Sequence, residues 1–331
     1  MPWARNNEYN EAIQNLRTSV SDEELRGGEP ALNALGLPMP ASGAFADVYK
    51  VVCPATGGAW AVKCFTREAP GLRDRYRAIS EHLWQRQLPF TVEFDFIEPG
   101  IRVGQEWFPF LKMRWVEGLR LNRFVGEFSQ KPKTLQLLFD MWVRLADRLR
   151  RAQIAHGDLQ HGNVLLLPER EGTQLRLKLV DYDGMHVPAL AAKRSGEVGH
   201  PAYQHPQRIA QGLYGAEADR FSHLAICTAL RCVMVAGRRL WDDFDNGDNL
   251  LFREADFHRP EASELFHRLW DLPRSETRAL VGRLILACKG PYEQVPLLDD
   301  VLDGETVRPL TPAEKGQVEA VLQAGSLALL P

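Results

Sequence analysis

One short polar string carries side chains that can divide proton transfer and cation binding between them. It spans residues 156–163 (HGDLQHGN) and connects a predicted long helix to a predicted strand. The carboxylate of Asp158 can accept a proton from a hydroxyl nucleophile, and the carboxamide oxygen of Asn163 can ligate a hard cation. A second string, residues 179–184 (LVDYDG), places Asp181 at the end of an apolar strand, where proteins commonly hold ligands. These side chains are the first candidates for a functional site.

The elements that must position these residues form a sheet-rich half followed by a helix-rich half. Runs of β-branched and aromatic residues bounded by Gly and Pro indicate strands, and apolar residues at helical spacing indicate helices. The predicted elements are a hairpin over 45–65 with its turn at 54–58, a helix over 71–88, strands over 91–100 and 107–116 with a turn at 98–100, a helix over 134–155, strands over 163–168 and 175–181, and a helix over 219–237. The last helix is apolar on nearly all sides, so we expect it to be buried in the second half.

The two ends of the chain are expected to lie outside these halves. Residues 1–37 resemble an extension in which a short helix begins with the capping box at Ser21 and stops at Gly27. Residues 296–331 read as a linker and a short tail helix that begins at Thr311. The expected division is therefore an extension at 1–37, a first lobe at 38–118, a second lobe at 119–295, and a linker with a tail helix at 296–331.

Composition indicates an ordinary globular protein and argues against several function classes. The 331 residues include 40 Lys and Arg against 43 Asp and Glu, a net charge of −3, so no net positive field draws the chain onto nucleic acid or an anionic membrane. The five cysteines are odd in number and form no C-x-x-C pair, which argues against a disulfide framework or a thiolate zinc site. Neither a secretory signal nor an apolar run of membrane-spanning length is found, so we expect a cytoplasmic protein. The oligomeric state is not indicated.

The order and spacing of these strings resemble those of the protein kinases. Residues 158–163, followed by the strand-end acid Asp181, resemble the catalytic core of that family. Upstream, Lys63 within Ala61-Val62-Lys63 resembles the strand lysine of the family, and residues 41–50 resemble its glycine-rich loop with Phe45 at the tip. The resemblance extends over about residues 38–290.

Two further segments strengthen the resemblance. Residues 110–118 resemble the fifth strand and hinge, with Met113 as the gatekeeper and Val116 offering backbone groups to adenine. Residues 199–207 (GHPAYQHPQ) resemble the end of an activation segment, and Asp219 resembles the acid that opens the central helix and anchors the catalytic loop.

The resemblance implies an α+β protein with the bilobal protein-kinase fold. It would have a small N-lobe built on an antiparallel sheet with one helix, and a mainly helical C-lobe, with ATP in the cleft between them. The implied activity is ATP- and Mg²⁺-dependent transfer of the γ-phosphate to a hydroxyl of a protein substrate, Ser/Thr rather than Tyr, as in the compact kinases of bacteria.

The resemblance also implies a role for each candidate. Asp158 would orient and deprotonate the acceptor hydroxyl, and Lys63 would hold the α- and β-phosphates while pairing with Glu81 on the N-lobe helix. Asn163 and Asp181 would hold Mg²⁺. The residues expected to bind the nucleotide are Ala41, Gly43, Phe45, Val48, Ala61, Lys63, Met113 and Val116.

The chain departs from the family pattern in the loops that touch phosphate. Gly43 remains of three expected glycines, while Ala41 and Ala46 each add a Cβ that limits how closely the backbone approaches a phosphate. Gly157 replaces the arginine that reads a phosphorylated activation segment, so we expect no phosphate-gated activation. Gln160 replaces the lysine that assists transfer in Ser/Thr kinases, which weakens the choice of acceptor.

Two departures lie downstream of the catalytic loop. Asp183 stands where the family has glycine, so we expect Gly184 to supply the backbone freedom needed there. Gln207 replaces a glutamate that makes a buried ion pair, and no arginine near Cys288 suggests a partner for it.

Other functions stay open at this point. Aminoglycoside and choline phosphotransferases carry similar catalytic loops without the lysine, so a small-molecule acceptor is the main alternative. A pseudokinase scaffold is the non-enzymatic alternative, motivated by the thinned glycine loop. The histidines at 156, 161, 186, 200 and 205 suggest a metal site only weakly, because no pair of them stands at ligand spacing on one regular element.

Overall fold

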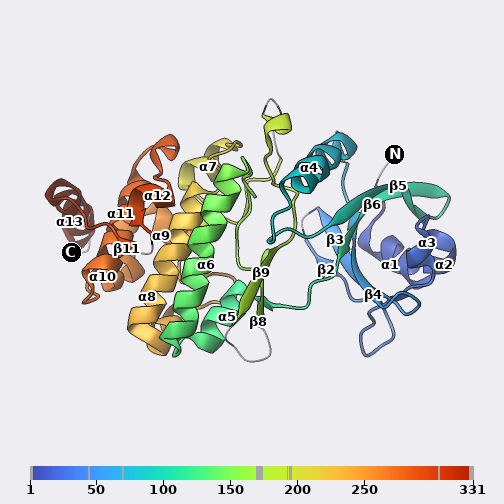
Figure 1. The fold of residues 1–331 in the computed structure, drawn as a ribbon, viewed down its shortest axis with the longest axis horizontal. Coiled ribbons are helices and arrows are strands. Elements are labelled where there is room, and N and C mark those ends of the chain that lie inside the picture. The colour runs from blue at the N-terminus through green and yellow to red at the C-terminus, as the bar shows by residue number, and fades with distance from the viewer. Residues whose placement is uncertain are drawn as a thin grey trace. The chain divides into compact units, whose positions relative to one another are not determined.

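The computed structural model describes residues 3–43, 45–68, 71–168, 174–191, 193, 196–304 and 306–327. The chain folds as a mixed α+β protein with an antiparallel sheet and many helices (Figure 1). Its contacts divide it into two compact units, one formed by Met1–Gln87 and Thr91–Glu117, the other by Leu88–Phe90 and Gly118–Pro331. Among the described residues, no helix has the length and apolar character needed to cross a membrane.

The first unit is built on an antiparallel sheet. The strand order is β1-β3-β4-β6-β5, and β2 pairs with β3 off this path. The strands are β1 (Glu29–Pro30), β2 (Ala41–Ser42), β3 (Ala46–Cys53), β4 (Gly58–Phe65), β5 (Phe94–Val103) and β6 (Glu106–Arg114). β3 and β4 form the hairpin that the sequence predicts over 45–65, with all eight residues of each strand in register.

The two faces of this sheet pack against different helices. Side chains alternate between the faces of a strand, so neighbouring residues of β4 take part in different cores. Cys64 joins an apolar cluster with Tyr9 and Ile13 of α1 (Asn6–Gln14). Phe65 contacts Tyr76 of α4 (Leu72–Arg86), with 6.0 Å between the ring centroids.

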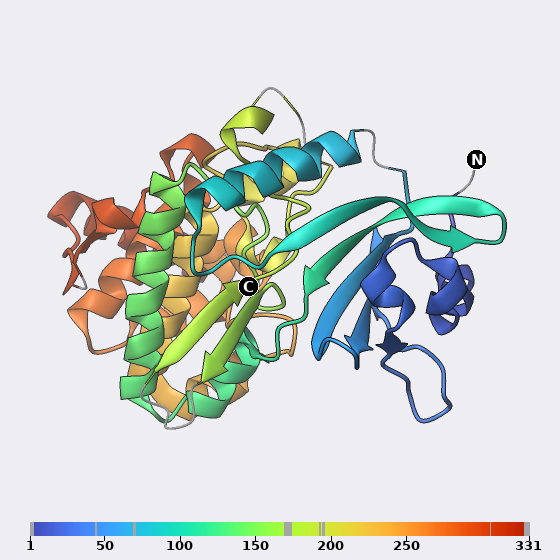
Figure 2. The same cartoon turned by 45° about the vertical axis from the view of Figure 1, so that its right-hand side comes forward.

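The N-terminal segment is an integral part of this core. After α1 come the short helices α2 (Leu16–Ser19) and α3 (Glu23–Arg26), which lie beside the sheet (Figure 2). The Tyr9 hydroxyl donates to the Phe65 carbonyl at 2.7 Å, and Asp22 caps α3 by accepting from the Leu25 N–H at 2.9 Å. Helices α1, α2 and α3 of the expected extension therefore cover one face of the first sheet, and its strand β1 pairs with β3.

The predicted turn at 98–100 is wrong. β5 continues through these residues with an irregularity in its pairing between Ile97 and Ile101, and the turn to β6 lies at Gly104, where φ is 61°. β5 is an edge strand of the sheet. Proline is tolerated at edges and bulges because it removes a ladder donor that has no partner there, so Pro99 did not end the strand.

The second unit is mainly helical with a small sheet. Its sheet has the order β7-β8-β9, with β7 (Leu119–Arg120), β8 (Val164–Pro168) and β9 (Leu175–Leu179). Its helices are α5 (Leu121–Phe128), α6 (Pro132–Arg151), α7 (Pro206–Gln211), α8 (Arg220–Phe244), α9 (Glu254–His258), α10 (Glu264–Trp270), α11 (Ser275–Lys289), α12 (Leu298–Val301) and α13 (Pro312–Leu327). A short hairpin joins β10 (Leu302–Asp303) to β11 (Thr306–Val307).

Helix α8 is the buried central element that its sequence predicts. A continuous run from Phe221 to Leu230 is buried, and α6 and α11 pack against the helix. The predicted end at Gly237 is confirmed, because α8 consists of two helices that meet at a kink at this glycine, where φ is 67° and ψ is −154°. Glycine reaches these non-helical angles without a steric penalty, so the first helix ends here and a second follows to Phe244.

Candidate functional site

The loop over residues 156–163 is held in place by Asp219 at the start of α8. The two carboxylate oxygens of Asp219 accept hydrogen bonds from the backbone N–H groups of His156 and Gly157, the latter at 2.8 Å. The ring Nε2 of His156, which is buried, lies 3.1 Å from the carbonyl of Val180. The anchoring role expected for Asp219 is thus seen directly, and His156 is a structural residue of the loop.

The carboxylate of Asp158 is held at both oxygens. Oδ1 accepts from the backbone N–H of His200 at 2.7 Å, and Oδ2 accepts from Nδ2 of Asn163 at 2.8 Å. Asp158 is half-buried. Two donors from separate segments fix the plane of the carboxylate, which is the requirement for a base that must meet a proton at a defined place.

Asn163 links this loop to the strand that carries Asp181. The backbone carbonyl of Asn163 accepts from the Val180 N–H at 3.0 Å, and the next residues continue as the β8–β9 ladder, in which Val164 faces Leu179. Two chain segments that are distant in the sequence therefore bring the Asn163 and Asp181 backbones together within the second unit.

The orientation of the Asn163 side chain suits a hard cation. Its Nδ2 donates to the Asp158 carbonyl at 3.0 Å as well as to the Asp158 carboxylate, so the amide hydrogens face Asp158 and the carboxamide oxygen faces away. Asp181 adopts φ of 66°, a conformation that non-glycine residues rarely take and that often marks a functional site. A carboxamide oxygen and a carboxylate are both oxygen donors of the kind that Mg²⁺ prefers.

A close backbone approach explains why position 157 is glycine. Gly157 has φ of 80°, and a Cβ added there would lie 2.1 Å from the carbonyl oxygen of Gly184. No side chain fits this position, so the arginine found in the family is excluded by packing. Gly184, which is expected to supply backbone freedom, has no positive φ, and the positive φ in this stretch of the described chain belongs to Asp181.

Residues 199–207 reach the loop over 156–163 through buried side chains as well as through the His200 N–H. Gly199 has φ of 78°, and a short 3-10 turn follows over Pro201–Tyr203. The buried hydroxyl of Tyr203 lies 3.0 Å from Nδ1 of His161 in the 156–163 loop. Burial is the main reason that the pKa of His161 is lowered. This segment and the loop therefore form one packed body.

The far end of this segment shows what replaces the expected ion pair. Gln207 accepts from the Tyr292 N–H through Oε1 at 2.8 Å, and His205 Nε2 lies 2.9 Å from the Ala287 carbonyl. These neutral hydrogen bonds tie the segment to the C-terminal end of α11 and to the turn that follows it. A glutamine can accept from a backbone N–H without a counterion. The hydrogen bond from Tyr292 to Gln207 therefore takes the place of the ion pair that a glutamate makes at this position in protein kinases.

The expected nucleotide residues of the first unit share neighbouring strands. Lys63 of β4 faces Val48 of β3 and Leu111 of β6, and Ala61 faces Met113. Ala41 of β2 faces Val48, and the Gly43 N–H donates to the Ala46 carbonyl at 2.9 Å. Phe45 is exposed and directly precedes β3, and Val116 follows β6.

Lys63 lies on the face of the sheet that carries α4. Lys63 is two residues before Phe65 on β4, so their side chains share a face, and the Phe65 ring contacts Tyr76 of α4. Only 8% of Lys63 is exposed. Glu81 lies on α4 and is exposed. The pairing of Lys63 with Glu81 and the nucleotide contacts stay predictions.

The structure adds two roles that the sequence did not indicate. The backbone N–H of His200 donates to the Asp158 carboxylate, and Asp248 accepts from His200 Nε2 at 3.1 Å. No local pattern marks either role, because one is a main-chain contact and the other joins residues far apart in the sequence.

No protein-family model and no curated protein sequence matches the chain.

Proposed function

We propose that the chain is an ATP- and Mg²⁺-dependent protein kinase whose two units are the two lobes of a bilobal protein-kinase fold. The observation that carries this proposal is the double anchoring of Asp158 by Asn163 and His200. A polar loop with only a structural role has no need to fix a half-exposed carboxylate from two sides. In the proposal, Lys63 of the first unit and Asp181 of the second both bind the nucleotide.

The reaction we propose transfers the γ-phosphoryl group from ATP to a hydroxyl. Asp158 accepts the proton of the hydroxyl, the acceptor oxygen forms a bond to the γ-phosphorus, and the bond from that phosphorus to the bridging oxygen breaks, releasing ADP. Asn163 and Asp181 hold Mg²⁺ through oxygen atoms, and Lys63 holds the α- and β-phosphates. A bound Mg²⁺ neutralises charge on the phosphate oxygens.

Asp158 is suited to this role because both of its hydrogen bonds come from groups that cannot supply an acidic proton. A backbone N–H and an amide N–H donate without ionising, so the carboxylate stays the proton acceptor. The same bonds leave further lone pairs on each oxygen for the incoming hydroxyl.

We propose a protein hydroxyl as the acceptor, with Ser/Thr ahead of Tyr. The support is the segment over 199–207, which is fixed to the catalytic loop by the Tyr203–His161 contact and to the end of α11 by His205. A fixed segment next to the base provides a surface on which an extended peptide can lie. Gln160 in place of lysine keeps the small-molecule phosphotransferases as the alternative.

One assay tests the proposal and separates the alternatives. The purified chain is incubated with Mg²⁺ and ATP radiolabelled in the γ-phosphate, alone, with a generic protein acceptor, and with a panel of aminoglycosides. Label on protein supports the kinase, whereas label on an aminoglycoside alone assigns a small-molecule phosphotransferase. A chain that binds nucleotide but transfers no label in any arm is assigned as a scaffold. The Asp158→Asn variant gives the background level of label in every arm.

A further inference from the structure

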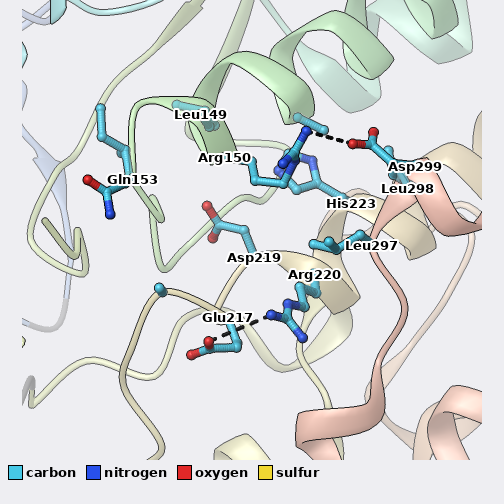
Figure 3. Close-up of a pocket in the computed structure, with 13 residues that line it drawn as sticks. Leu149, Arg150, Gln153, Glu217, Asp219, Arg220, His223, Leu297, Leu298 and Asp299 are labelled. Carbon is cyan, nitrogen blue, oxygen red and sulfur yellow. Dashed lines mark ion pairs between the residues drawn. The ribbon is translucent and has the colours of Figure 1, made fainter. Parts of the chain in front are cut away.

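The loop that carries Asp158 is supported from two sides, and the two supports differ in exposure. Asp219 holds two backbone N–H groups at the start of the loop, and it is buried beside a pocket of the second unit (Figure 3). The other support is the N–H of His200 on the Asp158 carboxylate, and the His200 ring leads from there to Asp248. The side chain of Asp248 is 74% exposed. The exposed support therefore acts on the proposed base itself, whereas the buried one acts on the backbone ahead of it.

Hydrogen bonds at both ring nitrogens define the state of the His200 side chain. Nδ1 accepts from the N–H of Ala202 at 3.2 Å, so the neutral ring carries its proton on Nε2. Nε2 lies 3.1 Å from Oδ2 of Asp248, which accepts this proton in a hydrogen bond. In this tautomer Nε2 has no free lone pair, so His200 offers no ligand to a metal ion here. The ring instead joins the backbone of the 199–207 segment to one carboxylate.

The short loop that carries Asp248 is held in one conformation by its own amide side chains and by α5. The N–H of Asp248 donates to Oδ1 of Asn246 at 2.9 Å, and Nδ2 of Asn122 on α5 donates to the carbonyl of Gly247 at 3.0 Å. The buried side chain of Asn249 donates to two backbone carbonyls, at 3.0 and 2.9 Å. Most surface ion pairs are weak partly because two flexible side chains must be ordered. A carboxylate on a fixed backbone has a smaller ordering cost, so it can hold its partner although it is exposed.

The peptide that presents the His200 N–H lies between a permissive residue and a restricted one. Gly199, with φ of 78°, leaves the peptide free to rotate on its N-terminal side. On the other side Pro201 confines His200 to extended backbone, where φ is −73° and ψ is 125°. The orientation of the N–H is therefore determined from the His200 side, by the ring and its two hydrogen bonds. Release of the ring would let the N–H turn away from Asp158.

We propose that Asp248 is a positioning residue for the proposed base: it holds the His200 ring in one tautomer and orientation, and so keeps the His200 N–H on Oδ1 of Asp158. The consequence for transfer rests on the proposed kinase function, whereas the hold on the N–H does not. In this role Asp248 needs an acceptor oxygen and not a negative charge. His161 Nε2 lies 3.6 Å from Oδ1 of Asp248, which is too far for a hydrogen bond, so the His200 ring is the partner that matters.

The hold on the N–H is tested by NMR of the ¹⁵N-labelled full chain, which does not depend on activity. We expect the wild-type His200 ring to be protonated at Nε2 and not at Nδ1, with the His200 amide proton shifted downfield by its bond to the carboxylate. Asp248→Ala should move this amide signal upfield and speed its exchange with solvent by roughly threefold to tenfold, as loss of one hydrogen bond provides. Asp248→Asn should keep the wild-type signals, because its amide oxygen still accepts from Nε2.

Asp242→Ala is the matched control for these spectra. Asp242 is also an exposed acid near the end of α8, but it pairs with Arg238 at 2.7 Å. It should leave the His200 signals unchanged. An Asp248→Ala variant with the wild-type amide signal overturns the proposal, and so does an Asp248→Asn variant that behaves like Asp248→Ala, since charge would then be the cause.

Phosphoryl transfer is measured on the same variants. Asp248→Ala should lower kcat by roughly threefold to tenfold and leave the KM for ATP unchanged, because the base loses its orientation while the nucleotide contacts stay. Asp248→Asn should stay within about twofold of the wild type. In a His200→Phe background, which removes both ring nitrogens, Asp248→Ala should cause no further loss. Additive losses would overturn the route through the ring.

The two measurements separate this proposal from the proposed function. If the wild type transfers no phosphate, the kinase proposal fails, and the His200 amide signal decides the hold on the N–H by itself. His200→Phe should also shift the Asp158 carboxyl signal in ¹³C spectra, so it replaces Asp248→Ala if that variant fails to fold. An unchanged Asp158 signal in His200→Phe would overturn the proposal.

Discussion

The backbone N–H of His200 donates to Oδ1 of Asp158 at 2.7 Å. The beginning of the 199–207 segment therefore acts directly on the orientation of the proposed base. In this arrangement the segment needs no phosphate to reach the loop, because a main-chain donor is available in every protonation or modification state. The bond depends on the local conformation of Gly199, where φ is 78°.

Replacing Gly199 with alanine should impair phosphoryl transfer. A Cβ there would lie 2.8 Å from the Gly157 carbonyl and 3.0 Å from Asp158 Oδ1, so the backbone must shift and the bond from His200 is lost. We expect kcat to fall by about tenfold or more, part of the roughly 10²–10⁴-fold that a positioned base contributes. Gly212→Ala is the matched control, since Gly212 also has positive φ but nothing within 4 Å of an added Cβ. Equal losses in both variants would contradict a role for the His200 bond.

Replacing Gly157 with alanine should destabilise the second unit. The added Cβ would lie 2.1 Å from the Gly184 carbonyl, and backbone cannot yield as a flexible side chain can. We expect a loss of about 3 kcal/mol or more in unfolding free energy, as for overpacking of a closed site combined with positive φ. Gly57→Ala, also at positive φ but in open space, should cost about 1 kcal/mol. Urea unfolding measures both, and a small effect at Gly157 would show that the close approach is not rigid.

Phosphatase treatment should leave the activity nearly unchanged. Gly157 has no side chain with which to read a phosphorylated segment, and the approach of Gly184 excludes one. The His200 contact and the Tyr203–His161 contact hold the segment without phosphate. Initial rates before and after phosphatase treatment, with the phosphatase removed, measure the effect. A large loss of rate would show that a phosphate has a role that these contacts do not replace.

The sequence predicts most elements because their patterns are local. The β3–β4 hairpin, α4, α6 and the burial of α8 follow from periodicity and turn residues alone. Pro99 misled the prediction, because an edge strand tolerates a proline. For the site, residue types and spacing pointed to Asp158, Asn163 and Asp181, and the resemblance to the protein kinases pointed to Asp219. The His200 donor and the Gly157–Gly184 contact could not be predicted, since both depend on backbone atoms brought together by tertiary structure.

The N-terminal segment should contribute stability that depends on pH. Glu24 accepts from the Thr56 hydroxyl at 2.6 Å and from Lys112 Nζ at 2.9 Å. The bond from Thr56, followed by that from Lys112, lowers the pKa of Glu24 from 4.5 to about 2. A lowered pKa in the folded state means that the stabilisation is complete above pH 4.5 and is lost as the pH falls towards 2.

Thr56→Val tests this pH dependence. The variant should be less stable than the wild type at pH 7, and the difference should narrow as the pH falls from 4.5 towards 2. NMR titration of the Glu24 carboxyl should give a midpoint near 2 in the wild type and a higher one in the variant. A pH-independent difference in stability would assign the effect to packing of the threonine methyl group.

Three substitutions should separate nucleotide binding from transfer. Asp158→Asn keeps a side chain of the same size, but its amide nitrogen cannot accept the hydrogen bond of one of the two neighbouring donors, and the side chain cannot accept the hydroxyl proton. We expect nucleotide binding within about threefold of the wild type and a loss of transfer of roughly 10²–10⁴-fold. Lys63→Ala and Asp181→Ala should lose transfer while the chain still unfolds cooperatively. Mg²⁺-dependent binding should weaken in Asp181→Ala, because a carboxylate ligand is removed.

The two binding outcomes distinguish the roles of the two acids. Titration calorimetry with a non-hydrolysable ATP analogue, with and without Mg²⁺, measures each affinity. If Asp158→Asn abolished nucleotide binding, Asp158 would belong to the nucleotide site and not to the acceptor side. If Asp181→Ala kept the full Mg²⁺ dependence, the cation would have other ligands, and the conformation of Asp181 at φ of 66° would need another explanation. Wild-type turnover in Lys63→Ala or Asp181→Ala would remove the basis for a kinase.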